Sequence, residues 1–250
     1  MMIIVTMLVL GLILGFVGAG GSGVIIAILT TVFGFSIHTA LGTSLLAMVF
    51  TTISGTFSHI REGNVVPKAG AAIGAFGAVG AFAGAHIANR IPAHDLTWLT
   101  SCMLFVSALL LWGRMFLYKK QTSETDDRLN LHGVRFWVSA ICLGLVTGLL
   151  SGTFGIGSTP FIQIGLLLLF GMSIRHAAGT TMLVILPIAL LGGIGYLWNG
   201  YVNLTLLAEV VIGTMIGSYI GAKFTKRLPP LLLKIAMVTV PTIGGLLLLV

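Results

Sequence analysis

Apolar runs of about 20 residues recur along this chain and decide in which solvent it can fold. The runs 97–117 and 231–250 are each as long as the roughly 20 residues that an α-helix needs to cross a bilayer. Only 8% of the residues are charged, against roughly 25% in a soluble domain, so the chain has too little polar surface to cover itself in water. We therefore predict an all-α protein that crosses a lipid bilayer several times.

The basic residues do not indicate a nucleic-acid partner, although the formal net charge is +7. They lie in short loops between apolar segments, where Lys and Arg set the orientation of a membrane protein. No Lys or Arg precedes the first apolar run, so we expect it to be kept as a helix and not cleaved as a signal peptide. Cys102 and Cys142 lie within apolar runs and indicate no disulfide or metal site. We predict no metal, no cofactor and no nucleic-acid partner.

The sequence repeats itself at a constant offset. GLILGFVGAGGSG at 11–23 aligns with GLLSGTFGIGSTP at 148–160, so the two numberings differ by 137 (148 minus 11). At the same offset, FGFSIHTALGTS at 33–44 aligns with FGMSIRHAAGTT at 170–181, and the register holds without a gap as far as Pro92. This pattern indicates an internal duplication. We predict three parts, which are a first transmembrane repeat at 1–117, a cytoplasmic linker at 118–133 and a second transmembrane repeat at 134–250.

Each repeat contains five apolar segments, of which the second is short. The expected segments are 2–17, 22–33, 38–58, 66–88 and 95–117, then 134–150, 159–171, 176–197, 203–224 and 231–250. At ~1.5 Å per residue, the second segment of each repeat is too short to cross ~30 Å of hydrocarbon as a straight helix. It either re-enters as a hairpin or crosses as a short tilted helix, and the sequence leaves both open.

In either case each repeat crosses the membrane an odd number of times, so the two repeats should be inverted relative to each other. With the linker 118–133 in the cytoplasm, alternation places every Lys and Arg except Arg90 on the cytoplasmic side, as the positive-inside rule requires. We expect both termini to be extracytoplasmic and the protein to reside in the inner (plasma) membrane of a bacterium.

The glycine-rich turns before the two short segments are the candidate site. A helix that starts inside the membrane leaves its first N–H groups unpaired, and the positive end of its dipole favours an anion. Two such starts near the midplane, in inverted repeats, are typical of a secondary transporter. The competing interpretation is that these glycines serve only close helix packing. The candidate residues are Gly18, Gly20, Gly21, Ser22 and Gly23 in the first turn, and Gly155, Gly157, Ser158, Thr159 and Gln163 at the second.

Further polar residues follow the short segments. Four hydroxyl residues near the start of the next helices either line the site or bond back to their own helix carbonyls; they are Thr43, Ser44, Thr180 and Thr181. Arg175 and His176 are candidates for binding the anion from the cytoplasmic side, although Arg175 also fits an ordinary cytoplasmic loop residue. Glu209 and His38 are candidates for ion coupling, and Glu209 alternatively pairs with a neighbouring helix.

In the order and duplication of these motifs, the chain resembles the sulfite exporter TauE/SafE family. The resemblance rests on the duplicated glycine turns and on ALGTS at 40–44 and AAGTT at 177–181, which open the next helices, and it covers 11–229. It implies a permease that exports sulfite, sulfonate or another organosulfur anion. The second turn reads GIGST where the family commonly has GIGGG, and Gly23 stands where the family has proline.

Three other interpretations compete with the transporter. A phosphate loop follows a strand in a water-soluble domain, whereas this glycine turn follows an apolar segment, and the chain has no Walker-type lysine motif for primary pumping. GGSG at 20–23 also fits the G-x-S-G pattern of rhomboid-like intramembrane proteases, with Ser22 as nucleophile and His86 as base. The second repeat has Thr159 and Lys223 at those positions, and a protease has no use for an inverted copy, so we expect no enzyme. An anion channel and a homodimeric assembly both stay open.

Overall fold

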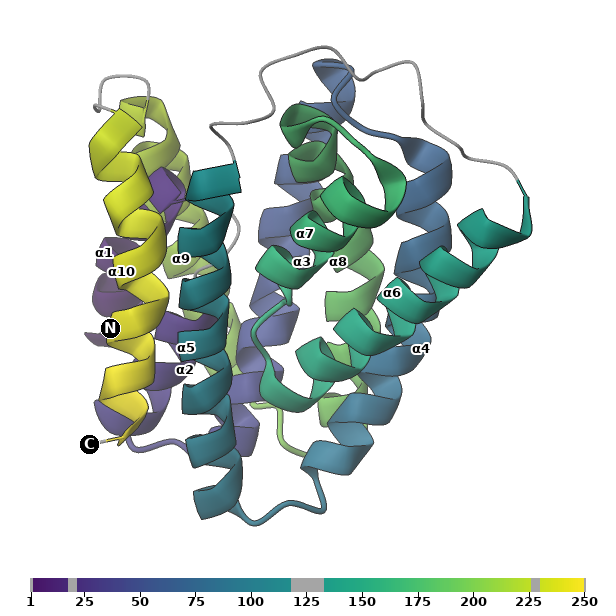
Figure 1. The fold of residues 1–250 in the computed structure, drawn as a ribbon. Coiled ribbons are helices and arrows are strands. Elements are labelled where there is room, and N and C mark those ends of the chain that lie inside the picture. The colour runs from purple at the N-terminus through teal and green to yellow at the C-terminus, as the bar shows by residue number, and fades with distance from the viewer. Residues whose placement is uncertain (1, 18–21, 118–132, 226–229, 250) are drawn as a thin grey trace.

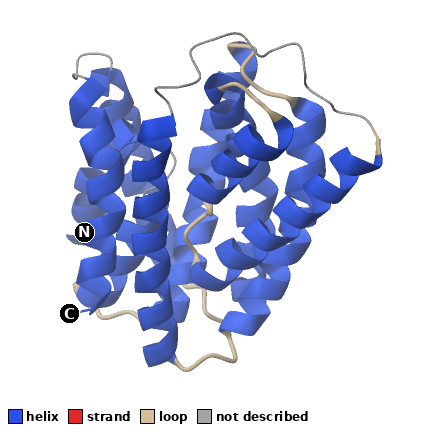
Figure 2. Ribbon diagram, viewed as in Figure 1, coloured by secondary structure: helices blue, strands red, loops and turns tan. Residues whose placement is uncertain are grey.

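The computed structural model describes residues 2–17, 22–117, 133–225 and 230–249, and over these ranges the chain forms helices and no strand (Figure 2). This confirms the all-α prediction. The helices are α1 (Met2–Val17), α2 (Ser22–Thr31), α3 (Ile37–Arg61), α4 (Pro67–Ala88), α5 (Ala93–Leu117), α6 (Val134–Phe154), α7 (Thr159–Phe170), α8 (Ile174–Trp198), α9 (Leu204–Thr225) and α10 (Pro230–Leu249). Helices α3, α4, α5, α6 and α8 are long and apolar enough to cross a membrane.

The duplicated motif F-G-x-S-I folds into the same turn in both repeats. Gly34 and Gly171 have φ angles of 70° and 64°, a left-handed conformation that glycine adopts without steric cost. The next helix then begins after a serine that caps it: Ser36 Oγ accepts the Thr39 N–H at 3.2 Å, and Ser173 Oγ accepts the His176 N–H at 3.3 Å. The local sequence therefore fixes where α3 and α8 begin.

The first helix of each repeat packs on the fourth helix of the other repeat, through contacts that only glycine permits. A Cβ atom at Gly148 in α6 would collide with the Gly77 carbonyl of α4, and one at Gly11 in α1 would lie 2.6 Å from the Thr214 carbonyl oxygen of α9. Because 148 minus 11 and 214 minus 77 are both 137, the two contacts are copies of one another. Small residues that let backbones approach are the usual way in which membrane helices associate.

The equivalent helices α3 and α8 pack antiparallel to each other. A Cβ atom at Gly55 would lie 3.2 Å from Met182 Sδ, and one at Gly192 would lie 3.2 Å from Leu45 Cδ1. The later residue of α3, Gly55, therefore contacts the earlier residue of α8, Met182, and the earlier residue Leu45 contacts the later residue Gly192. The two contacts are again related by the repeat offset. Inverted repeats require such packing, and the inversion of the repeats across a membrane stays a prediction.

The bundle has two ends. The turns α3–α4 and α7–α8 lie at the end where α5 stops, and we call this the linker end; the turns α2–α3, α4–α5 and α8–α9 lie at the opposite end (Figure 1). Four of the described basic residues belong to helix termini at the linker end, namely Arg61, Lys68, Arg135 and Arg175. Arg90 lies at the opposite end, in the turn after α4. This distribution is the one that the loop-charge argument predicts.

The two short helices do not have the length to cross a bilayer. Helix α2 has 10 residues and α7 has 12, which correspond to about 15 and 18 Å at ~1.5 Å per residue. Figure 1 shows α6 descending obliquely from the linker end and α7 returning toward that end. Residues 155–160, at the tip of this hairpin, are all buried. For the second repeat, the structure therefore favours the re-entrant hairpin of the two arrangements that the sequence left open.

The outer surface of the bundle is apolar and is bordered by tryptophans. Large side chains such as Val79, Leu109 and Leu168 are 60%, 64% and 69% exposed, as expected of a surface in contact with lipid tails. The exposed tryptophans fall near both ends, Trp98 and Trp198 near the opposite end, and Trp112 and Trp137 near the linker end. Tryptophan is enriched at the two membrane–water interfaces, so this placement indicates which axis of the bundle crosses the membrane.

The predicted orientation can be tested with reporter fusions. We expect alkaline phosphatase fused after Val250 to be active, because this reporter folds only outside the cytoplasm, and the same enzyme inserted after Thr125 in the linker to be inactive. Green fluorescent protein at the two sites should give the reverse pattern. An inactive phosphatase together with a fluorescent fusion at Val250 would contradict the extracytoplasmic C-terminus.

Candidate functional site

The second glycine turn has a strained backbone. Gly155, Gly157 and Ser158 have φ angles of 66°, 69° and 48°, and Ser158 is the non-glycine residue with positive φ in the described part of the chain. A left-handed conformation costs an L-residue roughly 1–2 kcal/mol, and such strain concentrates at functional sites. Ser158 precedes α7 without capping it by its side chain, although serine is a common capping residue.

This turn packs against helices of the other repeat. A Cβ atom at Gly155 would lie 2.6 Å from Leu41 Cδ2 of α3 and 3.1 Å from Ile26 Cδ1 of α2. A Cβ atom at Gly157 would lie 2.9 Å from Met48 Sδ, farther along α3. The tip of the α6–α7 hairpin thus reaches within one helical turn of the start of α2. The absence of side chains at Gly155 and Gly157 makes this approach feasible, so packing is part of their role.

The residues that open the two short helices share one unusual property. Ser22 opens α2 and Thr159 opens α7, and they are equivalent positions because 159 minus 22 is 137. Ser22 is 2% exposed and Thr159 is 4% exposed, yet neither hydroxyl has a hydrogen-bond partner among the described residues. Buried polar groups are nearly always hydrogen-bonded, and an exception calls for an explanation such as a ligand or ion that binds there.

Two further buried hydroxyls, on α3 and α6, are also without a described partner. Thr43 of α3 is 0% exposed, but it lies about 200° around the helix from Leu41 and so on a different face from Leu41 and Met48, the two residues that contact the second turn. Ser151 is 0% exposed in the last turn of α6. Gln163, one turn into α7, is 7% exposed. Of the first turn, Gly18, Gly20 and Gly21 lie outside the described residues, and Gly23 is packed against Leu104 of α5.

The other three hydroxyls proposed from the sequence have partners within the protein. Ser44 Oγ donates to the Leu41 carbonyl at 2.9 Å and Thr181 Oγ1 donates to the Ala177 carbonyl at 2.7 Å, which is the back-bonding alternative. Thr180 Oγ1 accepts the N–H of Val66 at 3.0 Å and so holds the α3–α4 turn on α8. Thr43 is equivalent to Thr180, but its hydroxyl has no such bond, so the two copies of this threonine differ in role.

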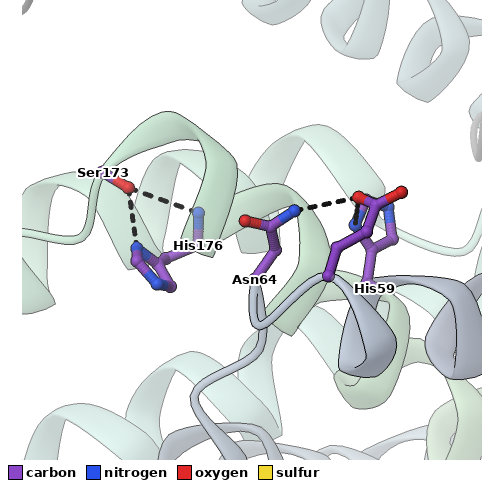
Figure 3. Close-up of polar contacts among 5 residues, drawn as sticks. His59, Asn64, Ser173 and His176 are labelled. Atoms are coloured by element: carbon purple, nitrogen blue, oxygen red, sulfur yellow. Dashed lines mark hydrogen bonds and ion pairs between the residues drawn. The ribbon is translucent and has the colours of Figure 1, made fainter.

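Arg175 and His176 lie at the linker end and not with the buried turns. Arg175 is exposed, and His176 Nδ1 lies 2.9 Å from Ser173 Oγ, at the start of α8 (Figure 3). The α3–α4 turn lies beside them, since a Cβ atom at Gly179 would contact the carbonyl of Asn64. This position places Arg175 and His176 away from the starts of α2 and α7, and their role in anion binding stays a prediction.

The two coupling candidates lie on different helices. His38 is 7% exposed, and its Nε2 lies 3.0 Å from the Ala88 carbonyl oxygen while its ring stacks on Tyr201 with centroids 4.8 Å apart. These contacts lie at the opposite end of the bundle. Glu209 is half-buried on α9, in the second turn of that helix. His38 therefore connects α3 with the end of α4 and with the α8–α9 turn, and the coupling roles of His38 and Glu209 stay predictions.

The protease dyad considered from the sequence does not form. Ser22 Oγ has no hydrogen-bond partner among the described residues, and His86 Nδ1 lies 3.0 Å from the Phe82 carbonyl oxygen of its own helix. The His86 ring packs against Phe82, with centroids 4.5 Å apart. A nucleophile and its base must lie within hydrogen-bond reach of each other. The geometry therefore does not support the dyad.

Sequence reasoning missed Tyr196, which holds the second turn in place. Its ring is 0% exposed, and its hydroxyl donates to the Gly152 carbonyl at 2.9 Å, where α6 ends. The ring fits only because residue 42 is glycine, since a Cβ atom there would lie 2.7 Å from Tyr196 Cβ. The available signal was a tyrosine hydroxyl within an apolar run, but the sequence does not reveal which carbonyl would accept its hydrogen bond.

Comparisons with known proteins agree with this architecture. A model of the sulfite exporter TauE/SafE family matches residues 3–248. The probable membrane transporter protein YdhB of Bacillus subtilis is 52% identical over 249 residues, which cover 100% of both chains. The probable membrane transporter protein MJ0441 of Methanocaldococcus jannaschii is 27% identical over 97% of this chain and 94% of its own. No solved structure matches the chain significantly.

Proposed function

Since the chain belongs to the sulfite exporter TauE/SafE family of membrane transporters, we propose that it exports a small sulfur-containing anion such as sulfite or a sulfonate. The proposed carrier works by alternating access to one buried site. The walls of this site are the start of α2, the start of α7 and the face of α3 that carries Leu41 and Met48.

One observation carries this proposal, namely that Ser22 and Thr159 are equivalent, buried and without hydroxyl partners among the described residues. Each opens a helix, where the first N–H groups are unpaired and the positive end of the helix dipole lies. An oxyanion would satisfy both kinds of donor and would balance the dipoles. In hydrocarbon, the alternative of leaving these groups unpaired costs several kcal/mol per group.

Outward transport follows from the electrical potential of the cell. With the inside negative, moving one negative charge outward across the membrane releases ~2.3 kcal/mol per 100 mV. A uniporter of this kind needs no ATPase domain. A coupled proton or sodium ion would add to this driving force, and Glu209 is the half-buried carboxylate that we propose for such coupling.

Flux measurements test the proposed function. The purified protein is reconstituted into liposomes loaded in alkaline buffer with sulfite, sulfate or methanesulfonate, with and without a pH gradient. We expect saturable efflux of sulfite or methanesulfonate, faster with an inside-negative potassium potential than without it, and no efflux from protein-free liposomes. If none of the anions moves under any gradient, the proposal is wrong.

The same liposomes separate a carrier from a channel. A carrier that alternates between two states shows faster uptake of labelled anion when unlabelled anion is present on the other side, because the loaded site returns in exchange. A channel gives flux that rises with concentration without saturating and shows no such exchange. Flux that does not saturate and shows no exchange would mean that the protein is a channel and that the proposed alternating access is wrong.

A further inference from the structure

The two short helices start near the middle of the bundle and run toward different ends of it. Helix α2 leads to the α2–α3 turn at the opposite end, whereas α7 leads to the α7–α8 turn at the linker end (Figure 1). Their 10 and 12 residues span about 15 and 18 Å, which is roughly half of the ~30 Å of hydrocarbon in a bilayer. Both helices therefore start near the midplane, and the positive ends of both dipoles lie there.

The tip of the α6–α7 hairpin connects these two starts. A Cβ atom at Gly155 would lie 3.1 Å from Ile26 Cδ1, and Ile26 is four residues after Ser22, so the two residues share one face of α2. A Cβ atom at Gly157, two residues farther along the tip, would lie 3.8 Å from Thr159 Oγ1. The face of α2 that carries Ser22 and the hydroxyl of Thr159 thus adjoin the same turn.

The polar side chains at these starts carry no formal charge. Ser22 and Thr159 are 2% and 4% exposed, and neither hydroxyl has a hydrogen-bond partner among the described residues. Gln163, one turn into α7, is a neutral amide. Every Lys and Arg in the described part of the chain lies within two turns of a helix end, or in the turn after α4 in the case of Arg90. By position along the helices, no described Lys or Arg stands at the start of α2 or α7.

The positive charge at the site therefore comes from the two helix starts themselves. Each start carries the equivalent of roughly +0.5 elementary charge, so two starts together offer roughly one. A monoanion balances this charge, and its oxygens accept hydrogen bonds from the unpaired N–H groups and from the two hydroxyls. A dianion would keep roughly one negative charge without compensation, and burial of an uncompensated charge is strongly unfavourable.

We propose that the buried site selects monoanions over dianions of the same shape. The forms that it carries are then hydrogensulfite and alkanesulfonates, which are oxyanions with a single negative charge, and the sulfite dianion and sulfate are excluded. This inference rests on the proposed anion transport at Ser22 and Thr159, and it adds the charge state of the substrate.

Competition between anions of one shape tests this selection in the full-length protein, reconstituted into liposomes. Methanesulfonate keeps one negative charge at every working pH, whereas methylphosphonate and sulfite pass from monoanion to dianion near neutral pH. Equal pH and equal potassium on both sides, with valinomycin, remove any potential that would favour one charge. We expect methylphosphonate to inhibit exchange of labelled methanesulfonate at least roughly 10-fold less well as the dianion than as the monoanion. The KM for total sulfite should rise over the same pH range, the KM for methanesulfonate should stay unchanged, and sulfate should not compete.

The outcomes separate this inference from the proposed function. If sulfate or the methylphosphonate dianion competes as strongly as the methylphosphonate monoanion does, the selection is overturned while anion transport stands. If the KM for methanesulfonate changes with pH in step with the KM for sulfite, a group of the protein titrates and the selection is again overturned. If no anion moves, the proposed function is refuted, and the site on which the selection rests is refuted with it.

A charge added at the site tests the same balance from the side of the protein. Thr159→Lys places an ammonium group at the start of α7, and Thr159→Met, of similar length but uncharged, is the matched control. We expect sulfate to compete at least roughly 10-fold better in Thr159→Lys than in Thr159→Met, because the added charge balances the second charge of the dianion. Equal competition by sulfate in two monodisperse variants would overturn the inference. If the lysine variant does not fold, the competition measured on the unmodified protein decides.

Discussion

A single methyl group added at Gly148 is expected to force α6 away from α4 and to lower the stability of the protein markedly. In Gly148→Ala the new Cβ atom would lie 2.6 and 2.7 Å from the carbonyl carbon and Cα of Gly77. These are backbone atoms, so no side chain can rotate away, and the two helices must separate along their length. We expect a loss at or above the upper end of the ~1–3 kcal/mol that overpacking usually costs.

Thermal unfolding of the detergent-solubilised protein measures this loss. At roughly 2–4 °C per kcal/mol for a chain of this size, the midpoint of Gly148→Ala should fall by about 6–12 °C, with a smaller monodisperse fraction on size exclusion. Gly113→Ala is the matched control, since it lies in helix α5 with no atom within 4 Å of the added Cβ. It should be as stable as the parent or slightly more stable. Equal midpoints for the two variants would contradict the packing.

Removing the hydroxyls of Ser22 and Thr159 together is expected to abolish anion binding at working concentrations. A hydrogen bond to a charged group contributes about 1.5–3 kcal/mol, so each loss should weaken affinity by about 10- to 100-fold. The double variant Ser22→Ala, Thr159→Val should therefore lose at least 100-fold in sulfite efflux measured below the parent KM. The single variants should each show an intermediate loss, because Ser22 and Thr159 occupy equivalent positions in the two repeats.

The control for these variants is Thr56→Val. Thr56 is also buried, at 6% exposure, and its hydroxyl has no described partner, but it lies 13 positions beyond Thr43 near the linker end of α3. Its replacement should leave efflux unchanged and stability unchanged or higher. If the double variant transports sulfite as well as Thr56→Val does, these hydroxyls do not bind the anion and the site lies elsewhere.

The fold could be predicted where apolar length and the duplication decide it. The expected segment at 22–33 became α2, which ends at Thr31 because Gly34 turns the chain with a positive φ. The expected segment at 38–58 became α3, which continues to Arg61. Hydropathy cannot predict this last turn, since Ser58, His59 and Arg61 are polar and lie at the end of the bundle where water solvates them.

The candidate site could be predicted only in part, because hydrogen-bond partners come from distant segments. The repeat offset paired Ser22 with Thr159, but it paired Thr43 with Thr180 equally well. In the structure the members of the second pair differ, since Thr180 Oγ1 accepts a hydrogen bond from the Val66 N–H, whereas Thr43 Oγ1 has no hydrogen-bond partner among the described residues. The same limit hid Tyr196, whose acceptor at Gly152 belongs to another helix. The limits of the three predicted parts of the chain stay predictions.

Two glycines of α4 allow a close contact with α8 that has no counterpart in the other repeat. Gly70 and Gly74 seat Leu183 and Pro187 of α8, where added Cβ atoms would lie 2.5 and 2.8 Å from those side chains. In α9 the corresponding residues are Leu207 and Val211, too large to hold α3 as closely. Helices α4 and α8 therefore pack closely at these positions, whereas Leu207 and Val211 keep the backbones of α9 and α3 farther apart. The two copies have diverged in how tightly the fourth helix of one repeat packs on the third helix of the other.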